Sequence, residues 1–335
     1  WKESRNVEEK IEKELKWAVL GTGVIANEMA QALEKMGKKL YAVANRTHSK
    51  AVEFAGKYGV QKIYDKIEDM FTDEETDIIY ITTPHNTHIK FMIEALKNGK
   101  HVLCEKSITL NSEELEEAVK IAKEKNLILG EAMTIFNMPL YTELLEIVNS
   151  GKLGDVKMIQ VNFGSYKEYD MSNRFFNRNL AGGALLDIGV YAISITRLFM
   201  TSKPDNVLSQ VKYAPTGVDE QASIIMMNKE QQMSTIALTL HSKQPKRVVI
   251  ACEKAYIEIT EYPRADKAKI VYTETGEIEE ITAGMTANAL QYELQNMEES
   301  VKTGINKMKL EYTIDVMDIM TKLRKDWGMT YPEEE

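Results

Sequence analysis

The chain has 335 residues, of which 28% are charged and 44% hydrophobic, and its formal net charge at pH 7 is −9. This length exceeds what one hydrophobic core usually supports, so we predict two domains. The negative charge without a basic cluster argues against nucleic-acid and membrane-surface partners, and no apolar run approaches the roughly 20 residues of a membrane-spanning helix.

Residues 1–14 form a charged N-terminal extension, which lacks the apolar core of a signal peptide. The two cysteines, Cys104 and Cys252, lie in apolar runs without a CxxC pattern, and the five histidines form no HExxH pattern. We therefore expect neither a disulfide bond nor a metal site, and these features favour the reducing cytoplasm.

Strand-like and helix-like segments alternate through residues 15–133, the predicted first domain. Predicted strands cover 17–20, 40–44, 77–82, 101–104 and 127–132, and predicted helices cover 25–36, 49–58, 87–98 and 112–125. Such alternation is typical of an α/β domain, with a parallel sheet covered by helices on both faces.

A different pattern runs through residues 134–335, the predicted second domain. A helix at 139–150 precedes strand candidates at 156–164, 206–213, 221–227, 233–240, 247–252, 255–260 and 269–273, interrupted by a helix at about 184–199. This pattern predicts an α+β domain with a large, mostly antiparallel sheet. Two helices, at about 287–302 and 313–327, close the chain, and we expect them to pack back toward the first domain.

The first predicted strand runs into a G-x-G-x-x-A motif, residues 21–26, at a strand-to-helix turn. Gly21 permits the tight turn, Gly23 lets the backbone approach a pyrophosphate, and Ala26 lets the helix pack closely on the sheet. This context favours a Rossmann fold over a purely structural turn. The predicted dinucleotide-binding residues of the motif are Gly21, Thr22, Gly23, Val24 and Ile25.

Asn45 and Arg46 follow the second predicted strand, where NAD sites carry an Asp or Glu for the ribose 2′-hydroxyl, and Asn45 could add a hydrogen bond to the cofactor. No carboxylate is present there to repel a 2′-phosphate, and the guanidinium of Arg46 can pair with it. We therefore expect NADP(H) to be preferred over NAD(H). The alternative is that Arg46 is a solvated loop residue.

Two further strand ends bring polar residues to the edge of the sheet at which open α/β proteins bind ligands. Near the nicotinamide half of the cofactor we expect Thr83, Pro84, His85, His88, Glu105 and Lys106. The alternatives are a surface ion pair at the second strand end and helix capping by the two histidines.

The segment AGGALLDIGVYAI, residues 181–193, places Asp187 and Tyr191 four residues apart on one face of a predicted helix. The surrounding residues are apolar, so a carboxylate there needs a partner, and Lys106 would be a good one. The alternative is a structural ion pair at the domain interface, with Tyr191 packed in the core.

GTGVIANEMA, TTPHNTH, GKHVLCEKS and GGALLDIGVY occur in an order and spacing that resemble the glucose–fructose oxidoreductase / inositol dehydrogenase / MocA (Gfo/Idh/MocA) family, from about Leu15 to Trp327. The resemblance implies a Rossmann domain and an open-faced antiparallel sheet domain often used for oligomer contacts. It also implies an active-site lysine at Lys106 and an aspartate at Asp187. Sugar enzymes of the family usually carry His at the position of Tyr191. A tyrosine there resembles the branch of dimeric dihydrodiol dehydrogenase and NADP-dependent xylose dehydrogenase.

The chain departs from the family pattern at two places. Ser107 stands where most members have the proline of an EKP motif, which puts the presentation of Lys106 in doubt. Thr134-Ile135-Phe136-Asn137 replaces the Trp and Arg that the dihydrodiol branch often shows after EAM. This second departure puts an aromatic dihydrodiol in doubt and leaves a small sugar or polyol open.

The resemblance implies reversible hydride transfer between nicotinamide and a secondary alcohol or carbonyl of a small sugar, polyol or dihydrodiol. Lys106 as an ammonium can stabilise the substrate oxygen, with Asp187 holding it in place. Tyr191 is the candidate acid–base, its pKa lowered by the adjacent lysine cation. In a variant of this mechanism Lys106 donates the proton and Tyr191 only positions the substrate.

Substrate walls are expected from the second domain, with Arg174 and Phe176 as the candidate substrate residues and ordinary loop anchoring as the alternative. The residues considered for these walls lie just before the helix of Asp187 and Tyr191: Tyr166, Arg174, Phe175, Phe176 and Asn177. We expect a homo-oligomer, a dimer or tetramer, through the sheet of the second domain. Two rival functions remain: a non-catalytic regulator that senses NADP(H), and a redox-neutral glycosidase with tightly held NAD. The intact lysine, aspartate and tyrosine argue against the regulator, and Arg46 argues against retained NAD.

Overall fold

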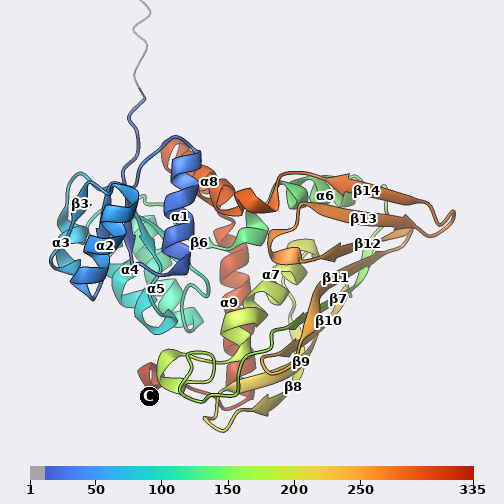
Figure 1. Cartoon of the computed structure of the whole chain (residues 1–335). Helices are drawn as coiled ribbons and strands as arrows, with labels where there is room; N and C mark the ends of the chain where they lie inside the picture. Colours follow the sequence, from blue (N-terminus) through green and yellow to red (C-terminus); the bar gives the residue numbers. More distant parts are fainter. Residues whose placement is uncertain (1–11) are drawn as a thin grey trace, which may run out of the picture.

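The structure, a computed structural model, describes residues 12–335. Most of the N-terminal extension predicted at 1–14 therefore lies outside the described residues. Two sheets organise the described part of the chain: a smaller helix-covered sheet stands beside a long, twisted one, with α9 between them (Figure 1).

The first sheet is parallel, with the strand order β3-β2-β1-β4-β5-β6. Its strands are β1 (Trp17–Leu20), β2 (Ala42–Ala44), β3 (Lys62–Ile63), β4 (Ile78–Ile81), β5 (His101–Glu105) and β6 (Leu129–Ala132). The order reverses between β1 and β4, and the crevice beyond the carboxyl ends of strands at such a point is where α/β sheets bind dinucleotides.

Helices cover both faces of this sheet. They are α1 (Val24–Lys35), α2 (His48–Tyr58), α3 (Ile67–Thr72), α4 (His88–Lys97) and α5 (Ser112–Glu124). Successive residues of β1 point to opposite faces, so Trp17 and Val19 pack in the core with α1 and α2, while Ala18 and Leu20 pack in the core with α4 and α5. Burial on both faces explains why these strands read as continuous apolar runs.

The second sheet has eight strands in the order β14-β13-β12-β11-β7-β10-β9-β8. The strands are β7 (Val156–Gly164), β8 (Asn206–Tyr213), β9 (Asp219–Met227), β10 (Met233–Thr239), β11 (Gln244–Cys252), β12 (Ala255–Thr260), β13 (Lys267–Tyr272) and β14 (Ile278–Thr282). Strands β7 and β10 pair in parallel, and the other described pairs are antiparallel. The predicted fold class is therefore confirmed.

The remaining helices are α6 (Pro139–Asn149), α7 (Val190–Phe199), α8 (Ala289–Thr303) and α9 (Leu310–Asp326). Helix α7 packs on β7 and β10, while α8 lies against α1, and α9 lies against α5 and α7. The indole Nε1 of Trp17 in β1 donates to Glu298 of α8 at 2.9 Å. The two sheets are thus joined by the helices that close the chain.

The structure differs from the prediction at four elements. Strand β3, helix α3 and strand β14 were not predicted, because each is short or lies at a sheet edge, where few residues are buried. The helix predicted at 184–199 begins with a π-helical turn, Leu185–Gly189, and continues as α7.

The stretch Arg178–Phe199, which includes α7, is long and apolar enough to cross a membrane by length and composition alone. Inside the protein, 83% of its most apolar window is buried. The core helix of a globular domain has the same composition, so this stretch is weak evidence for a membrane span.

Candidate active site

A cavity of about 550 Å³ lies at the carboxyl ends of β1, β4 and β5 and is closed on its other side by the segment before α7. Its walls contain many of the residues predicted from the sequence: Gly23, Val24, Ile25, Thr83, Pro84, His85, Glu105, Lys106, Arg174, Asp187 and Tyr191. The strand ends of the first sheet and the segment that leads into α7 therefore meet at one site.

The turn between β1 and α1 has the geometry that the glycine motif predicts. Gly21 has φ +106°, and a Cβ there would lie 2.3 Å from Thr82 Oγ1, so only glycine fits. Gly23 has open space where a Cβ would stand, and α1 begins without a side-chain cap or an acidic residue in its first turn. These residues fit a pyrophosphate at the N-terminus of α1.

The residues predicted to select the cofactor lie outside the cavity. Asn45 and Arg46 follow β2, and Arg46 is exposed. The side-chain amide of Asn45 donates to the carbonyl of Thr47 at 3.0 Å, which shapes the turn before α2. Arg46 forms no ion pair with any residue in the range 12–335. Thr22 lies in the turn beside Gly23.

The two histidines after β4 differ in their surroundings. His85 lines the cavity, and its Nε2 donates to the carbonyl of Lys106 at 3.0 Å. Burial lowers the pKa of His85 to about 3, so its ring is neutral. His88 is fully buried, with ring nitrogens 2.7 Å from the Thr83 carbonyl and 2.9 Å from the Ser107 carbonyl. It therefore links the ends of β4 and β5 and does not reach the cavity.

Lys106 and Asp187 form the ion pair that the sequence suggested for a buried carboxylate and a nearby lysine. The ammonium of Lys106 donates to the main-chain carbonyl of Asp187 at 2.8 Å and lies 3.4 Å from its Oδ1. Burial lowers the pKa of Lys106, but Tyr191, Asp187 and Glu105 outweigh burial and leave that pKa raised. Burial raises the pKa of Asp187, but Lys106 and Arg174 leave it lowered. Both residues are therefore charged at neutral pH.

Tyr191 lies beside this pair, with its ring centroid 4.9 Å from the ammonium of Lys106. Its ring stacks on Phe163 of β7, with centroids 5.8 Å apart. The expectation of a lowered tyrosine pKa was wrong: burial raises the pKa of Tyr191 more than the Lys106 cation lowers it. Tyr191 is consequently a protonated phenol at neutral pH, able to donate a hydrogen bond.

The segment that carries Asp187 and Tyr191 is fixed at its start by Gly183 and Asp219. Gly183 has φ +123°, and a Cβ there would lie 2.1 Å from Asp219 Oδ1. Asp219 Oδ2 accepts from the backbone N–H of Leu185 at 2.6 Å. Gly182 is equally constrained, since a Cβ there would lie 2.9 Å from three carbonyl oxygens. Sequence reasoning did not find Asp219, which follows no motif.

Behind Lys106, buried polar groups hold the end of β5. The hydroxyl of Tyr80 donates to Glu105, whose pKa is raised by burial. Ser107 follows Lys106 through a cis peptide bond, and its hydroxyl donates to the carbonyl of Leu186 at 2.6 Å. The serine that replaces the family proline thus binds the neighbour of Asp187, and Lys106 keeps its place in the cavity.

On the substrate side, the structure places Phe175 and not Phe176 on the cavity wall. Phe176 is fully buried and packs edge-on against Tyr169. Phe175 lines the cavity beside Arg174, whose guanidinium carbon lies 4.2 Å from the Phe175 ring centroid. One residue of register separates the two phenylalanines, and irregular backbone gives no periodicity from which to choose between them.

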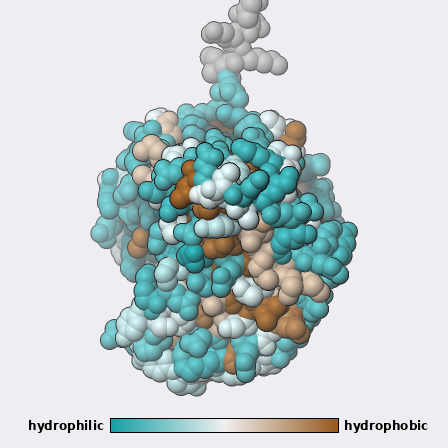
Figure 2. Space-filling view, turned by 90° about the vertical axis from the view of Figure 1, so that its right-hand side faces the viewer, coloured by the Kyte–Doolittle hydropathy of each residue, from teal (hydrophilic) through white to brown (hydrophobic). Residues whose placement is uncertain are grey.

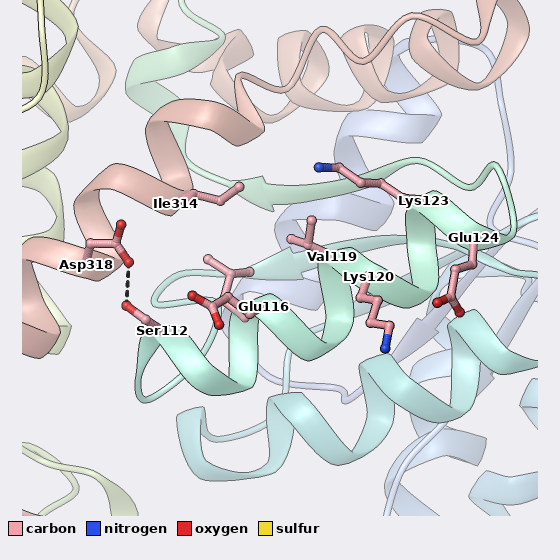
Figure 3. A pocket seen from close by; sticks show the side chains of 9 residues that line it. Ser112, Glu116, Val119, Lys120, Lys123, Glu124, Ile314 and Asp318 are labelled. Atoms are coloured by element: carbon pink, nitrogen blue, oxygen red, sulfur yellow. Dashed lines mark hydrogen bonds between the residues drawn. The ribbon is translucent and has the colours of Figure 1, made fainter.

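A second cavity, of about 460 Å³, lies between α5 and α9, away from the residues described above (Figure 3). Leu115, Val119 and Ile314 line it together with charged side chains, and Ser112 donates to Asp318 at 2.6 Å. Within residues 12–335, no group of three or more His, Cys, Asp or Glu side chains could hold a metal ion.

Comparison with protein families gives two matches. Residues 15–133 match the model described as "Oxidoreductase family, NAD-binding Rossmann fold", and residues 141–258 match the "GFO/IDH/MocA C-terminal domain".

Among curated proteins, trans-1,2-dihydrobenzene-1,2-diol dehydrogenase from Xenopus laevis is 30% identical over 329 residues, covering 95% of this chain and 99% of that protein. The enzyme of the same name from Homo sapiens is 26% identical over 332 residues, covering 96% and 99%.

Two solved structures show the same fold. A 3-ketoreductase from Actinomadura kijaniata, in complex with NADP and TDP-benzene, superposes with a TM-score of 0.81 at 19% identity, covering 93% of this chain and 96% of that one. Levoglucosan dehydrogenase, in complex with NADH and levoglucosan, superposes with a TM-score of 0.85 at 16% identity, covering 94% and 98%.

Proposed function

The chain belongs to the Gfo/Idh/MocA family of oxidoreductases, and we propose that it transfers a hydride between NADP(H) and a secondary alcohol or carbonyl of a small sugar, polyol or diol. The observation that carries this proposal is the meeting of Lys106, Asp187 and Tyr191 with the glycine turn in one cavity. Named relatives of this chain are dehydrogenases and a ketoreductase, and the chain is an enzyme of that class acting on CH–OH groups.

The cofactor, when bound, supplies or accepts the hydride, and the residues of this chain manage one proton and one developing charge. The Lys106 ammonium would stabilise negative charge on the substrate oxygen, because it is buried and already oriented by Asp187. The Tyr191 phenol would donate its proton to a carbonyl oxygen during reduction and accept it during oxidation. Glu105, Thr83, Pro84 and His85 would surround the nicotinamide half of the cofactor.

We infer a preference for NADP(H) from the end of β2. Arg46 is exposed there, and the turn carries no carboxylate that would repel a 2′-phosphate. The 3-ketoreductase was solved with NADP and levoglucosan dehydrogenase with NADH, so proteins of this fold use either cofactor. Arg46 is therefore the residue on which the choice depends.

The test is a pair of titrations of the purified protein with NADPH and with NADH, followed by nicotinamide fluorescence. Tighter binding of NADPH, lost in Arg46→Ala, supports the cofactor proposal, whereas equal affinity for both cofactors removes it. Turnover is then measured at the nicotinamide absorbance with aldoses, polyols and dihydrodiols. Free sugar released from a glycoside without net change in absorbance would instead support the redox-neutral glycosidase.

We also propose that the open face of the second sheet joins two copies of the chain. Exposed apolar side chains on this face come from neighbouring strands: Met158, Leu208, Ile225, Met233 and Tyr256. Figure 2 views the molecule from this side and shows hydrophobic residues in a broken band among hydrophilic ones. Large exposed apolar side chains gathered on one face in this way favour a protein interface over a solvated face.

A further inference from the structure

Cationic side chains gather on the substrate side of the active-site cavity. Arg174 lines the cavity, and its Nη1 lies 3.9 Å from Asp187 Oδ1. That carboxylate is already shared with Lys106, which lies closer, at 3.4 Å. Arg174 is 61% exposed at its side chain, so its guanidinium reaches solvent at the cavity mouth. Its charge is therefore only partly balanced within the protein.

Lys167 brings a second charge beside the cavity wall: it does not line the cavity itself but contacts Phe175, which does. Its Nζ lies 4.2 Å from the Phe175 ring centroid, which is also the distance of the Arg174 guanidinium carbon from that centroid. The two charges are thus no farther apart than twice this distance. The Lys167 backbone is fixed, because its N–H donates to the Leu240 carbonyl at 2.8 Å and its carbonyl accepts from His241 Nδ1 at 2.8 Å.

Lys167 has no carboxylate partner within 4 Å among residues 12–335. Burial lowers the pKa of Lys167, and Arg174, Lys246 and Lys106 lower it further against the opposing effect of Asp187. Asp187 is the carboxylate that Lys106 and Arg174 both approach within 4 Å, and its charge also acts on Lys167.

Lys246 extends the cluster along the sheet. Its Nζ lies 5.1 Å from the Phe163 ring centroid, and Phe163 stacks on Tyr191. The nearest carboxylate of Glu261 is 3.9 Å from its Nζ, too far for a strong ion pair. In a chain with net charge −9, the substrate side of the cavity is therefore locally positive.

We propose that Lys167 and Arg174, with Lys246 beside them, bind a carboxylate or phosphate group of the substrate while Lys106 and Tyr191 hold its reacting oxygen. Like charges this close repel one another unless an anion lies between them, and guanidinium and ammonium groups together suit oxyanions. The substrate class is then an acidic or phosphorylated sugar or polyol, in preference to a neutral polyol or dihydrodiol. This inference rests on the proposed function for the hydride transfer itself.

The first arm of the test measures binding, and it needs no turnover. The NADPH complex of the full chain is titrated with sodium malonate, inorganic phosphate and glycerol, following nicotinamide fluorescence. We expect malonate or phosphate to bind and glycerol not to bind, and Lys167→Met and Arg174→Met each to weaken the anion at least tenfold. Lys167→Arg, which keeps the charge, should restore most of the affinity.

Lys157→Met is the matched control. Lys157 is an exposed lysine near the start of β7, whereas Lys167 follows the end of that strand at Gly164, and Lys157 does not line the cavity. Lys157→Met removes the same charge away from the cavity, and we expect its anion affinity to stay within twofold of the wild-type value. An NADPH affinity that falls as far as anion affinity in Lys167→Met would assign the cluster to the cofactor and overturn the proposal.

The second arm compares matched substrates: D-glucuronate, D-glucose 6-phosphate and D-glucose, each with NADP⁺. We expect a higher kcat/KM for an acidic compound than for D-glucose, and we expect this advantage to fall with added salt. Comparing D-glucuronate with D-glucose 6-phosphate shows whether the site prefers a carboxylate or a phosphate. In Lys167→Met the ratio of acidic to neutral kcat/KM should fall at least tenfold. Binding without turnover would contradict the proposed function only, whereas failure of malonate and phosphate to bind overturns the anion site.

Discussion

The ammonium of Lys106 contacts Asp187 twice, at the main-chain carbonyl and at the carboxylate. Two contacts to one residue fix the direction of the ammonium as well as its charge, and the cation lies where a substrate oxygen can reach it. The ammonium group is thus held in place before the reaction. A preorganised charge of this kind lowers the activation barrier of hydride transfer most.

Replacing Lys106 with Met should abolish most turnover and leave cofactor binding nearly intact. Methionine keeps the length and removes the charge, and loss of one such stabilising group typically costs about 10²–10³ in kcat. Stopped-flow kinetics measures the loss of turnover, and NADPH titration measures whether cofactor binding is retained. Lys203→Met removes an exposed lysine paired with Asp318 and should change neither, and turnover that survives in Lys106→Met contradicts the mechanism.

Tyr191→Phe isolates the phenolic proton. Phenylalanine keeps the stacking on Phe163, so KM should change little while kcat falls by about 10²–10⁴. Because burial raises the pKa of Tyr191, reduction by the wild-type enzyme should stay constant through neutral pH and decline only at alkaline pH. A pH–rate profile is the measurement, and an equal alkaline decline in Tyr191→Phe would exclude this tyrosine as the proton donor.

At the scale of elements, the segment before α7 depends on two residues, Gly183 within the GGALLDIGVY motif and Asp219, which no motif marks. Gly183 can adopt φ +123° at no steric cost, and Asp219 from β9 caps the N–H of Leu185. Asp187 and Tyr191 follow within one or two turns, so an error at the start of the segment displaces both.

Gly183→Ala should lower stability and activity together. The strained backbone costs about 1–3 kcal/mol, and the new Cβ also meets Asp219. Gly217→Ala is the control, because Gly217 has φ +89° but open space around its missing Cβ. Urea unfolding and kcat should show a stability loss in both variants and an activity loss only at Gly183. Full activity in Gly183→Ala would show that the contact with Asp219 does not position the site.

Asp219 also links stability to pH. Burial raises its pKa to about 7, above the unfolded value of 3.8, so the folded state binds this proton more tightly. Its stabilisation is complete below the unfolded value and is lost as pH rises through about 7, with a slope of at most about 1.4 kcal/mol per pH unit. Asp219→Asn should remove this part of the decline between about pH 4 and 7 in urea unfolding. An unchanged slope would mean that Asp219 is ionised throughout.

How much the sequence predicts depends on burial. Strands β1, β4 and β5 are buried on both faces, and their apolar runs predict them to within one or two residues. Strand β14, with the sequence IEEIT at the sheet edge, is mostly exposed and was missed. Among site residues, those on motifs were found, and Phe175 was among the candidates for the substrate wall. Lys167 and Asp219 were not found, because only tertiary contacts bring them to Phe175 and to Leu185.

At the scale of the molecule, the active site is complete only when the two halves meet. Lys106 comes from the first sheet, and Asp187 and Tyr191 come from the segment that packs under the second. Helices α8 and α9 lock this arrangement, since Arg324 of α9 donates to the carbonyl of Leu110 at 2.5 Å and Trp17 of β1 donates to α8. Spacing in the sequence gives no measure of such contacts, which is why Asp187 and Lys106 remained an open pair until the structure placed them 3.4 Å apart.

The open face of the second sheet is where we expect two copies of the chain to associate. Met233 lies opposite Met158 across the β7–β10 pair, near the centre of the sheet, so a symmetric interface would bury both residues in each copy. Met233→Lys would then place two buried charges in one interface, which should weaken association at least 100-fold. Light scattering after gel filtration should give twice 38.1 kDa for the wild type and 38.1 kDa for the variant. Ile305→Lys, an exposed position between α8 and α9, should leave the dimer intact, and a wild-type monomer would refute the interface.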